Sequence, residues 1–238
     1  MLKGLYTAYT GMINEQHRMD TMTNNLANAS TVGFKKEGAT SQSFDDILTV
    51  KIKDQSVGLQ NVQRIGTNNP GVKIGENYTD YTQGSFRVTD NTYDLALGGE
   101  GFFAIEYTNK AGETSTMYTR AGQFTLNRDG YLVNENGDYV LGTQNQRIRL
   151  NTLQDSEISS NGTITQNGVE VARIQVTDFE DYNYLEKFGE TYYRPVEGAR
   201  TVQTGATVNS GYLEMSNVQV VSEMVNLIAI TRAYESNQ

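Results

Sequence analysis

The residues of this chain that could perform acid–base chemistry stand alone rather than in clusters. The chain has one histidine, His17, and no cysteine. A Ser–His–Asp triad therefore has only one possible base, and thiolate zinc sites and disulfides are excluded. His17 lies between Gln16 and Arg18 in a segment with helical periodicity, where a solvated histidine on a helix face is the expected arrangement. We predict no catalytic histidine.

Adjacent carboxylates occur at Asp45–Asp46 and again at Glu180–Asp181. Two carboxyl groups placed across a sugar ring are the requirement for glycoside hydrolysis. Neighbouring residues in irregular segments more simply form solvated charge pairs, or the first turn of a helix. We therefore predict no enzymatic activity from these pairs.

The stretch "NENGDYVLGTQ" places Asn134, Asn136 and Asp138 at alternate positions, as a calcium loop does. Tyr139 stands where the turn glycine of such a loop would be, and no glutamate closes it. A hairpin turn is the better interpretation. The glycine-rich "GGEGFF" at 98–103 precedes a strand rather than a helix, so it predicts no phosphate site. We expect no metal and no cofactor.

Composition narrows the class of protein. The 238 residues carry a net charge of −9 and only 37% hydrophobic residues, with 23 glycines, which suits a turn-rich β protein. The negative charge repels phosphate backbones and anionic lipid, so we predict no nucleic-acid binding. The N-terminus lacks the uninterrupted apolar run of a cleaved signal peptide, and no stretch is apolar for ~18 residues, so no membrane insertion is expected.

Apolar residues near the N-terminus follow a partial heptad. Leu5, Met12, Met19 and Leu26 lie seven apart, and Tyr9 occupies the second seam position. This spacing predicts an amphipathic helix over residues 2–28.

The C-terminal stretch mirrors that pattern. Its apolar stripe comprises Val218, Val221, Met224, Val225, Leu227, Ile228 and Tyr234. A second face is small and comprises Ser222, Asn226, Ala229 and Ala233. Ser216 or Asn217 is the expected N-cap. Each terminal helix presents more apolar surface than one partner helix can cover, so we expect neighbouring copies to complete the burial. The alternative is a helix pair folded onto the β domain of its own chain.

The middle of the chain has the period of β-strands. "DLALGGEGFFAIEY" predicts a strand, a glycine break and a second strand. Turn dipeptides that favour positive φ, and hence type I′ hairpins, follow at Asp129–Gly130, Asn136–Gly137, Asn161–Gly162 and Asn167–Gly168.

These patterns predict a mainly β fold, with a central antiparallel β domain flanked by N- and C-terminal α-helices that pair as a coiled coil. The expected domains are an N-terminal assembly helix at 1–36, a connector with little period at 37–75, the β domain at 76–208 and a C-terminal assembly helix at 209–238.

The end of the first helix raises a separate question. In "MTNNLANASTVGFKKE", Asn24, Asn25 and Asn28 can bond backbone groups locally or across a subunit boundary. Gly33 permits the left-handed conformation of a helix stop. Phe34 then stands as an exposed apolar anchor, and the following lysines complement the helix C-terminal dipole. A C-cap that contacts its own helix is the alternative.

Four stretches carry a resemblance. "NNLANASTVGFKKE", "TDYTQGSFRVTDNTYDLALGGEGFFAIE", "YTRAGQFTLNRDGYLVNENGDYVLG" and "SNVQVVSEMVNLIAITRAYESNQ" resemble, in this order, the signatures of bacterial flagellar rod and hook proteins. The resemblance covers most of residues 1–142 and 210–238, and it is closer to the distal than to the proximal rod members.

The resemblance implies a structural subunit of the flagellar basal-body rod. Such a subunit is exported without a cleaved signal peptide by the flagellar type III apparatus, works outside the cytoplasmic membrane and assembles with its own copies and with other rod and hook subunits into a helical tube that transmits torque. Because family members usually continue the final helix beyond "RAYESN", it also implies that this helix is cut short at Gln238. A subunit interface is expected at Leu5, Tyr9, Met12, Met19, Asn24, Asn25, Leu26, Asn28, Gly33, Phe34, Val218, Val221, Met224, Val225, Leu227, Ile228, Arg232, Ala233 and Tyr234.

A second hypothesis from another class stays open at this point. Fifteen tyrosines would also suit a secreted β domain that binds or acts on glycans, with terminal helices that merely oligomerise it.

Overall fold

The computed structural model describes residues 2–52 and 62–238, and the chain divides into two compact units. Unit 1 comprises residues 1–27, 36–80 and 219–238. Unit 2 comprises residues 28–35 and 81–218. Unit 1 therefore gathers both ends of the chain, and unit 2 holds its middle.

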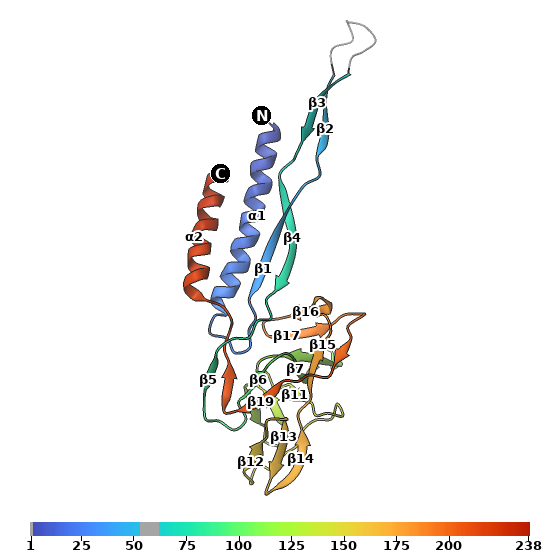
Figure 1. Ribbon diagram of the computed structural model, residues 1–238, viewed down its shortest axis with the longest axis vertical. Helices are drawn as coiled ribbons and strands as arrows, with labels where there is room; N and C mark the ends of the chain where they lie inside the picture. Colours follow the sequence, from blue (N-terminus) through green and yellow to red (C-terminus); the bar gives the residue numbers. More distant parts are fainter. Residues whose placement is uncertain (1, 53–61) are drawn as a thin grey trace. The chain divides into compact units, whose positions relative to one another are not determined.

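Unit 1 is built around two helices, α1 (Leu2–Ala27) and α2 (Val220–Asn237). Strands β1 (Glu37–Ser43) and β4 (Val72–Thr79) pair antiparallel, as do β2 (Ile47–Ile52) and β3 (Val62–Asn68). Helix α1 lies between α2 and the β1–β4 ribbon (Figure 1).

The strands of unit 1 correct the expectation of an aperiodic connector over 37–75. β1 reads "EGATSQS" and is mostly exposed, so neither of its faces needs the apolar alternation that identifies a half-buried strand. Backbone pairing across the ribbon therefore leaves almost no trace in the sequence. Residues 53–61 of the expected connector lie outside the described residues.

Unit 2 consists of short strands joined by tight turns. In chain order these are β5 (Phe86–Val88), β6 (Leu95–Gly98), β7 (Phe102–Thr108), β8 (Thr114–Thr119), β9 (Phe124–Leu126), β10 (Leu132–Asn134), β11 (Tyr139–Val140), β12 (Ser156–Ile158), β13 (Thr163–Gln166), β14 (Val169–Arg173), β15 (Val176–Phe179), the 3-10 helix η1 (Tyr182–Tyr184), β16 (Leu185–Phe188), β17 (Tyr192–Pro195), β18 (Thr201–Val202), β19 (Thr207–Ser210) and β20 (Tyr212–Glu214).

The largest sheet of unit 2 has the strand order β16-β17-β8-β7-β11-β10-β9, and β15 pairs with both β7 and β18. Smaller sheets are β12-β13-β14, β19-β6 and β20-β5. Every strand pairing that involves described residues is antiparallel. This confirms the prediction of a mainly β fold with two terminal helices and a central antiparallel region.

Strand β7 lies at the centre of the unit 2 core because both of its faces are buried. Phe103 packs in one apolar cluster with Leu95 and Phe124. Phe102, the preceding residue, points into a second cluster with Phe179 and Tyr193. Successive side chains of a strand point to opposite faces, so the pair Phe102–Phe103 joins the two clusters.

The turns follow the predicted positions but not always the predicted type. Asn167 (φ 51°) and Gly168 (φ 77°) both adopt positive φ in a two-residue connection between β13 and β14, as a type I′ turn requires. At Gly130, Gly137 and Gly162 only the glycine does so. In these three turns more than two residues connect the paired strands. The residue before each glycine therefore keeps a negative φ.

The start of α2 differs from the prediction. Its N-cap is Gln219, which makes no side-chain cap hydrogen bond. The Ser216 hydroxyl instead accepts from the backbone N–H of Val218 at 3.3 Å. Asn217 donates to the carbonyl of Thr82 at 3.2 Å. Both polar side chains therefore form hydrogen bonds within unit 2, and neither one caps α2.

Candidate functional site

Helix α2 packs against α1. Its buried residues are Glu223 and Ile230, whereas Asn226 and Ala229 of the small face are exposed. Asn226, Ala229 and Ala233 line a hollow that they share with Glu15 and Met22 of α1. Further along, a Cβ placed on Gly11 would lie 3.2 Å from the Asn237 amide nitrogen. The absence of a side chain at Gly11 thus leaves room for Asn237 of the antiparallel helix.

The apolar stripe of α2 is left uncovered in this molecule. Val221 is 76% exposed and Val225 is 61% exposed, and Met224 and Ile228 on the same side are also exposed. On α1, Leu5 is 69% exposed and Tyr9 is more than half exposed. Both helices therefore present large apolar side chains outward.

The predicted interface residues fall into three groups by exposure. The exposed ones are Leu5, Tyr9, Asn24, Val221, Met224, Val225, Ile228 and Arg232. The partly exposed ones are Met12, Met19, Leu26, Leu227, Ala233 and Tyr234. The buried ones are Asn25, Asn28, Gly33, Phe34 and Val218. Only the first two groups have surface to offer a neighbour.

Asn25 is occupied within unit 1. Its amide nitrogen donates to the Glu37 carbonyl at 2.7 Å, and its amide oxygen accepts from the Glu37 N–H at 2.9 Å. This reciprocal pair imitates a strand hydrogen-bond ring and ties the end of α1 to the start of β1. Asn28, the next predicted asparagine, accepts from the Thr31 hydroxyl at 3.0 Å within unit 2.

Gly33 and Phe34 are anchored inside unit 2. Gly33 has φ 69°, and a Cβ at this position would stand 2.3 Å from the backbone nitrogen of Ala121, so only glycine fits. Phe34 is 0% exposed, and the Lys187 ammonium lies 4.1 Å from its ring centroid. The expectation of Phe34 as an exposed anchor is wrong, because unit 2 encloses the ring.

The lysines after Phe34 form ion pairs rather than merely facing the helix terminus. In unit 2 the Lys35 ammonium lies 2.7 Å from Oε1 of Glu214 and donates to the Thr82 carbonyl at 2.7 Å. In unit 1 Lys36 pairs with Glu223, which is buried in the first turn of α2. Two consecutive lysines thus bind two glutamates from the last part of the chain.

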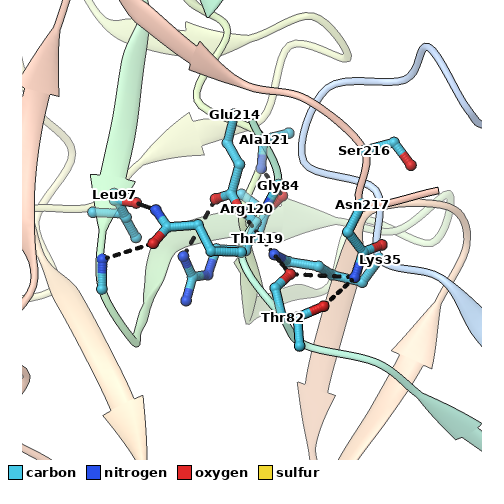
Figure 2. Close-up of polar contacts among 12 residues, drawn as sticks. Lys35, Thr82, Gly84, Leu97, Thr119, Arg120, Ala121, Glu214, Ser216 and Asn217 are labelled. Atoms are coloured by element: carbon cyan, nitrogen blue, oxygen red, sulfur yellow. Dashed lines mark hydrogen bonds and ion pairs between the residues drawn. The ribbon is translucent and has the colours of Figure 1, made fainter. Parts of the chain in front are cut away.

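Glu214 is the centre of a buried polar cluster (Figure 2). Besides Lys35, it receives Nη1 of Arg120 at 3.3 Å and the backbone N–H of Gly84 at 3.0 Å. The Arg120 guanidinium also lies over the Phe102 ring, 5.3 Å from its centroid. Three donors from distant parts of unit 2 therefore converge on one carboxylate. The sequence contains no signal for this cluster except a lone glutamate in the apolar stretch "GYLEM".

Unit 1 also has an exposed apolar patch that the sequence analysis did not predict. Tyr6 of α1, Ile47 and Val50 of β2, and Pro70 line an open hollow. Its signal is the short apolar run "ILTV" inside the expected connector.

The residues considered for chemistry have structural partners. His17 Nε2 lies 3.0 Å from the Asn77 side-chain oxygen. Asp46 accepts from Asn69 at 3.2 Å, and Asp181 accepts from the Asn183 N–H at the start of η1. In the part of the chain that the structure describes, no three acidic or histidine side chains gather as a metal site would require.

In the hairpin turn expected at Asn134–Asp138, the side-chain oxygen of Asn134 accepts hydrogen bonds from the backbone of the same turn. Asn134 Oδ1 accepts the backbone N–H groups of Asn136 at 3.0 Å and Asp138 at 2.9 Å. The Tyr192 hydroxyl donates to Asp138 at 2.6 Å and accepts from both asparagine amides. Burial of the phenol, together with this bond to Asp138, raises the pKa of Tyr192 to about 12.

These features define a class of protein: a subunit with a closed β unit and a pair of terminal helices whose large apolar side chains remain uncovered. Within the described ranges, neither helix is long and apolar enough to span a membrane.

Comparison with known proteins gives the family. The model "Flagella basal body rod protein" matches residues 5–35, "Flagellar hook protein FlgE/F/G D1 domain" matches residues 96–166 and "Flagellar basal body rod FlgEFG protein C-terminal" matches residues 209–238. These matches cover most of α1 with the segment that follows it, the middle of unit 2 and the whole of α2.

Whole-length relatives agree with the family models. The flagellar basal-body rod protein FlgG of Bacillus subtilis is 33% identical over 259 residues, covering 100% of this chain and 93% of the relative. FlgF of Caulobacter vibrioides is 33% identical over 238 residues, covering 99% and 91%. The flagellar hook-basal body complex protein FlhO of Bacillus subtilis is 32% identical over 252 residues, covering 100% and 93%.

The chain belongs to the family of bacterial flagellar basal-body rod and hook proteins. Several of its relatives are FlgG proteins, and within the family it is most like this distal rod type. It is a structural rod subunit of the flagellar basal body. The family match decides against the glycan-binding hypothesis.

Proposed function

We propose that copies of this chain assemble into a helical tube through the outward apolar stripes of α1 and α2, and that the tube transmits torque. The observation that supports this is the exposure of Val221, Met224, Val225 and Ile228 along one side of α2. Complete burial of each such side chain contributes ~1.5–3 kcal/mol. A row of them left in water would be an aggregation hazard unless another subunit covers it.

The coiled-coil seam lies between molecules in this proposal. Within the chain, α2 buries Glu223 and Ile230, and the large residues of the apolar stripe remain for neighbours. The heptad residues Leu5 and Tyr9 are exposed on α1 in the same way. Knobs of this size fit the holes of a neighbouring helix. The interface of the proposal is the exposed and partly exposed groups defined above, and it omits the five buried residues.

The partners in this proposal are further copies of the chain and other rod and hook subunits, delivered by the flagellar type III export apparatus. The chain acts as a structural element and not as an enzyme. Torque passes along the tube because stacked, mutually buried helices resist twisting.

The proposal is tested by Val225→Asp in cells that carry only this variant of the rod subunit. Because Val225 is 61% exposed, the isolated variant keeps the circular dichroism spectrum of the parent chain. In the assembly the same carboxylate is buried without a partner, which costs several kcal/mol per interface. We expect loss of the subunit from isolated basal bodies, detected by immunoblot, and loss of motility.

The matched control is Leu153→Asp, which also places aspartate at an exposed apolar position but in unit 2, where Leu153 is 93% exposed. This variant is expected to incorporate normally. Incorporation of Val225→Asp at the level of the control would refute the proposed seam. Ile228→Asp repeats the test at a second position of the stripe.

A further inference from the structure

Unit 2 contains the dipeptide Asn–Gly three times, and the structure restrains the three copies very differently. The copies are Asn136–Gly137, Asn161–Gly162 and Asn167–Gly168. Asn–Gly is the dipeptide most open to spontaneous deamidation, because glycine has no side chain to hinder its own backbone nitrogen. We infer that Asn167 is a site of spontaneous deamidation in the folded protein, and that Asn136 and Asn161 are protected.

The reaction needs two groups to move. The deprotonated backbone nitrogen of the glycine attacks the side-chain amide carbon of asparagine, forms a five-membered succinimide and expels ammonia. Water then opens the ring at either carbonyl and leaves aspartate or isoaspartate. A hydrogen bond to the glycine N–H, or one that fixes the asparagine amide, has to break before the attack.

Asn136 is held at both groups. Its amide nitrogen donates to the Tyr192 hydroxyl at 2.7 Å. The attacking nitrogen of Gly137 donates its proton to the Asn134 carbonyl at 3.1 Å.

Asn161 is held in a comparable way. Its amide oxygen accepts from the Thr163 N–H at 3.2 Å. The N–H of Gly162 donates to the Ser159 carbonyl at 2.8 Å, and Gly162 is itself buried.

Asn167 has neither restraint. Among the described residues, no hydrogen-bond partner holds its amide or the N–H of Gly168. Both residues are exposed, and they form the tip of the hairpin between β13 and β14 (Figure 1). β14 is the edge strand of its sheet and is almost wholly exposed, so the tip can open with little loss of packing.

The product differs from the parent in charge and in backbone length. Deamidation adds one negative charge to a chain that already carries −9. The isoaspartate product also inserts a methylene carbon into the main chain. A two-residue type I′ turn has no room for that extra atom, so the reaction alters the hairpin as well as its charge.

The test is peptide mapping by mass spectrometry of the full chain, incubated in its folded state at mildly alkaline pH. We expect Asn167 to convert at least about tenfold faster than Asn136 and Asn161, the factor that one or two ordinary hydrogen bonds add to a barrier. The same chain incubated in urea is the control, because unfolding removes the restraints and the three rates then converge. Equal rates in the folded chain, or a slower rate at Asn167, would overturn the inference.

A matched variant tests the cause of protection. Tyr192→Phe removes the acceptor of the Asn136 amide and leaves the β13–β14 hairpin unchanged. Conversion at Asn136 is expected to rise severalfold while Asn167 keeps its rate. An unchanged rate at Asn136 would show that this hydrogen bond gives no protection, and it would refute the stated mechanism.

Discussion

The Lys35 ammonium lies 2.7 Å from the Glu214 carboxylate, although 179 positions separate the two residues in the chain. Lys35 is 1% exposed and Glu214 is 0% exposed. The pair fixes the segment after α1 to the end of β20 inside unit 2. Arg120 brings a second buried cation to the same carboxylate, so two cations that water cannot reach share the single negative charge of Glu214.

Removing this anion is expected to destabilise unit 2 strongly. Glu214→Gln keeps the size of the side chain but removes the negative charge that the buried Lys35 and Arg120 share. Breaking a buried ion pair in this way costs ~3–5 kcal/mol. Urea unfolding followed by tyrosine fluorescence measures the loss as a lower midpoint.

The control for that experiment is Glu186→Gln. Glu186 pairs with Arg194 across β16 and β17, and both side chains are about half exposed. Exposed pairs contribute ~0–1 kcal/mol, so the midpoint hardly moves. Equal shifts for the two variants would show that burial does not set the strength of the Glu214 cluster.

Gly33→Ala is expected to destabilise the protein although it adds a single methyl group. The left-handed conformation at φ 69° costs a residue with a side chain about 1–2 kcal/mol. The new Cβ would also lie 2.3 Å from the Ala121 nitrogen, which forces the backbone apart and adds to the loss. Thermal unfolding of the two chains gives the difference.

Gly205→Ala serves as the matched glycine control. Its φ lies outside the left-handed region, and nothing stands within 4 Å of the added Cβ. The change is expected to be neutral or to stabilise by about 0.4–1 kcal/mol through the unfolded state. A loss at Gly33 no larger than at Gly205 would contradict the close fit of Gly33 against Ala121.

We expect the folded protein to lose stability at alkaline pH because of Tyr192. Burial and the hydrogen bond to Asp138 raise the pKa of Tyr192 from 10.0 to about 12. The folded state thus favours the neutral phenol, and its contribution is complete below pH 10. It is lost as the pH rises from 10 to about 12, because the unfolded chain ionises first.

The measurement is the unfolding midpoint from pH 8 to pH 12 for the parent chain and for Tyr192→Phe. The variant is less stable at neutral pH because it loses three hydrogen bonds. Its midpoint is expected to fall less steeply above pH 10. Parallel slopes in the two proteins would rule out Tyr192 as the titrating group.

The elements with a strong local signal could be predicted from the sequence. The heptad from Leu5 to Leu26 predicts α1, which spans Leu2–Ala27. "DLALGG" and "FFAIEY" predict β6 and β7, because a short apolar run next to a glycine break indicates a buried strand. The turn at Asn167–Gly168 follows from the conformational preferences of those two residues.

The parts that depend on distant residues could not be predicted. The ring of Phe34 looks exposed because its enclosure comes from unit 2 and includes Lys187, far along the chain. The sequence predicts that Lys35 and Lys36 complement the dipole at the end of the first helix, and it does not predict their ion pairs with Glu214 and Glu223. The local sequence pattern contains no information on contacts between residues far apart in the chain. The family resemblance indicated the function without knowledge of these contacts.

We expect substitution of Asn25 to weaken the junction between α1 and β1 in unit 1. Asn25→Ala leaves the N–H and the carbonyl of Glu37 without the partner that now satisfies both. Unsatisfied buried groups cost ~1–3 kcal/mol each, partly offset here by the better helix propensity of alanine. Thr23→Ala, on the exposed side of the same helix, bonds only within the helix and is expected to change stability by about 0.5 kcal/mol or less. Hydrogen exchange at the Glu37 amide should accelerate in Asn25→Ala and remain unchanged in Thr23→Ala; equal protection in both variants would mean that Asn25 does not hold this junction.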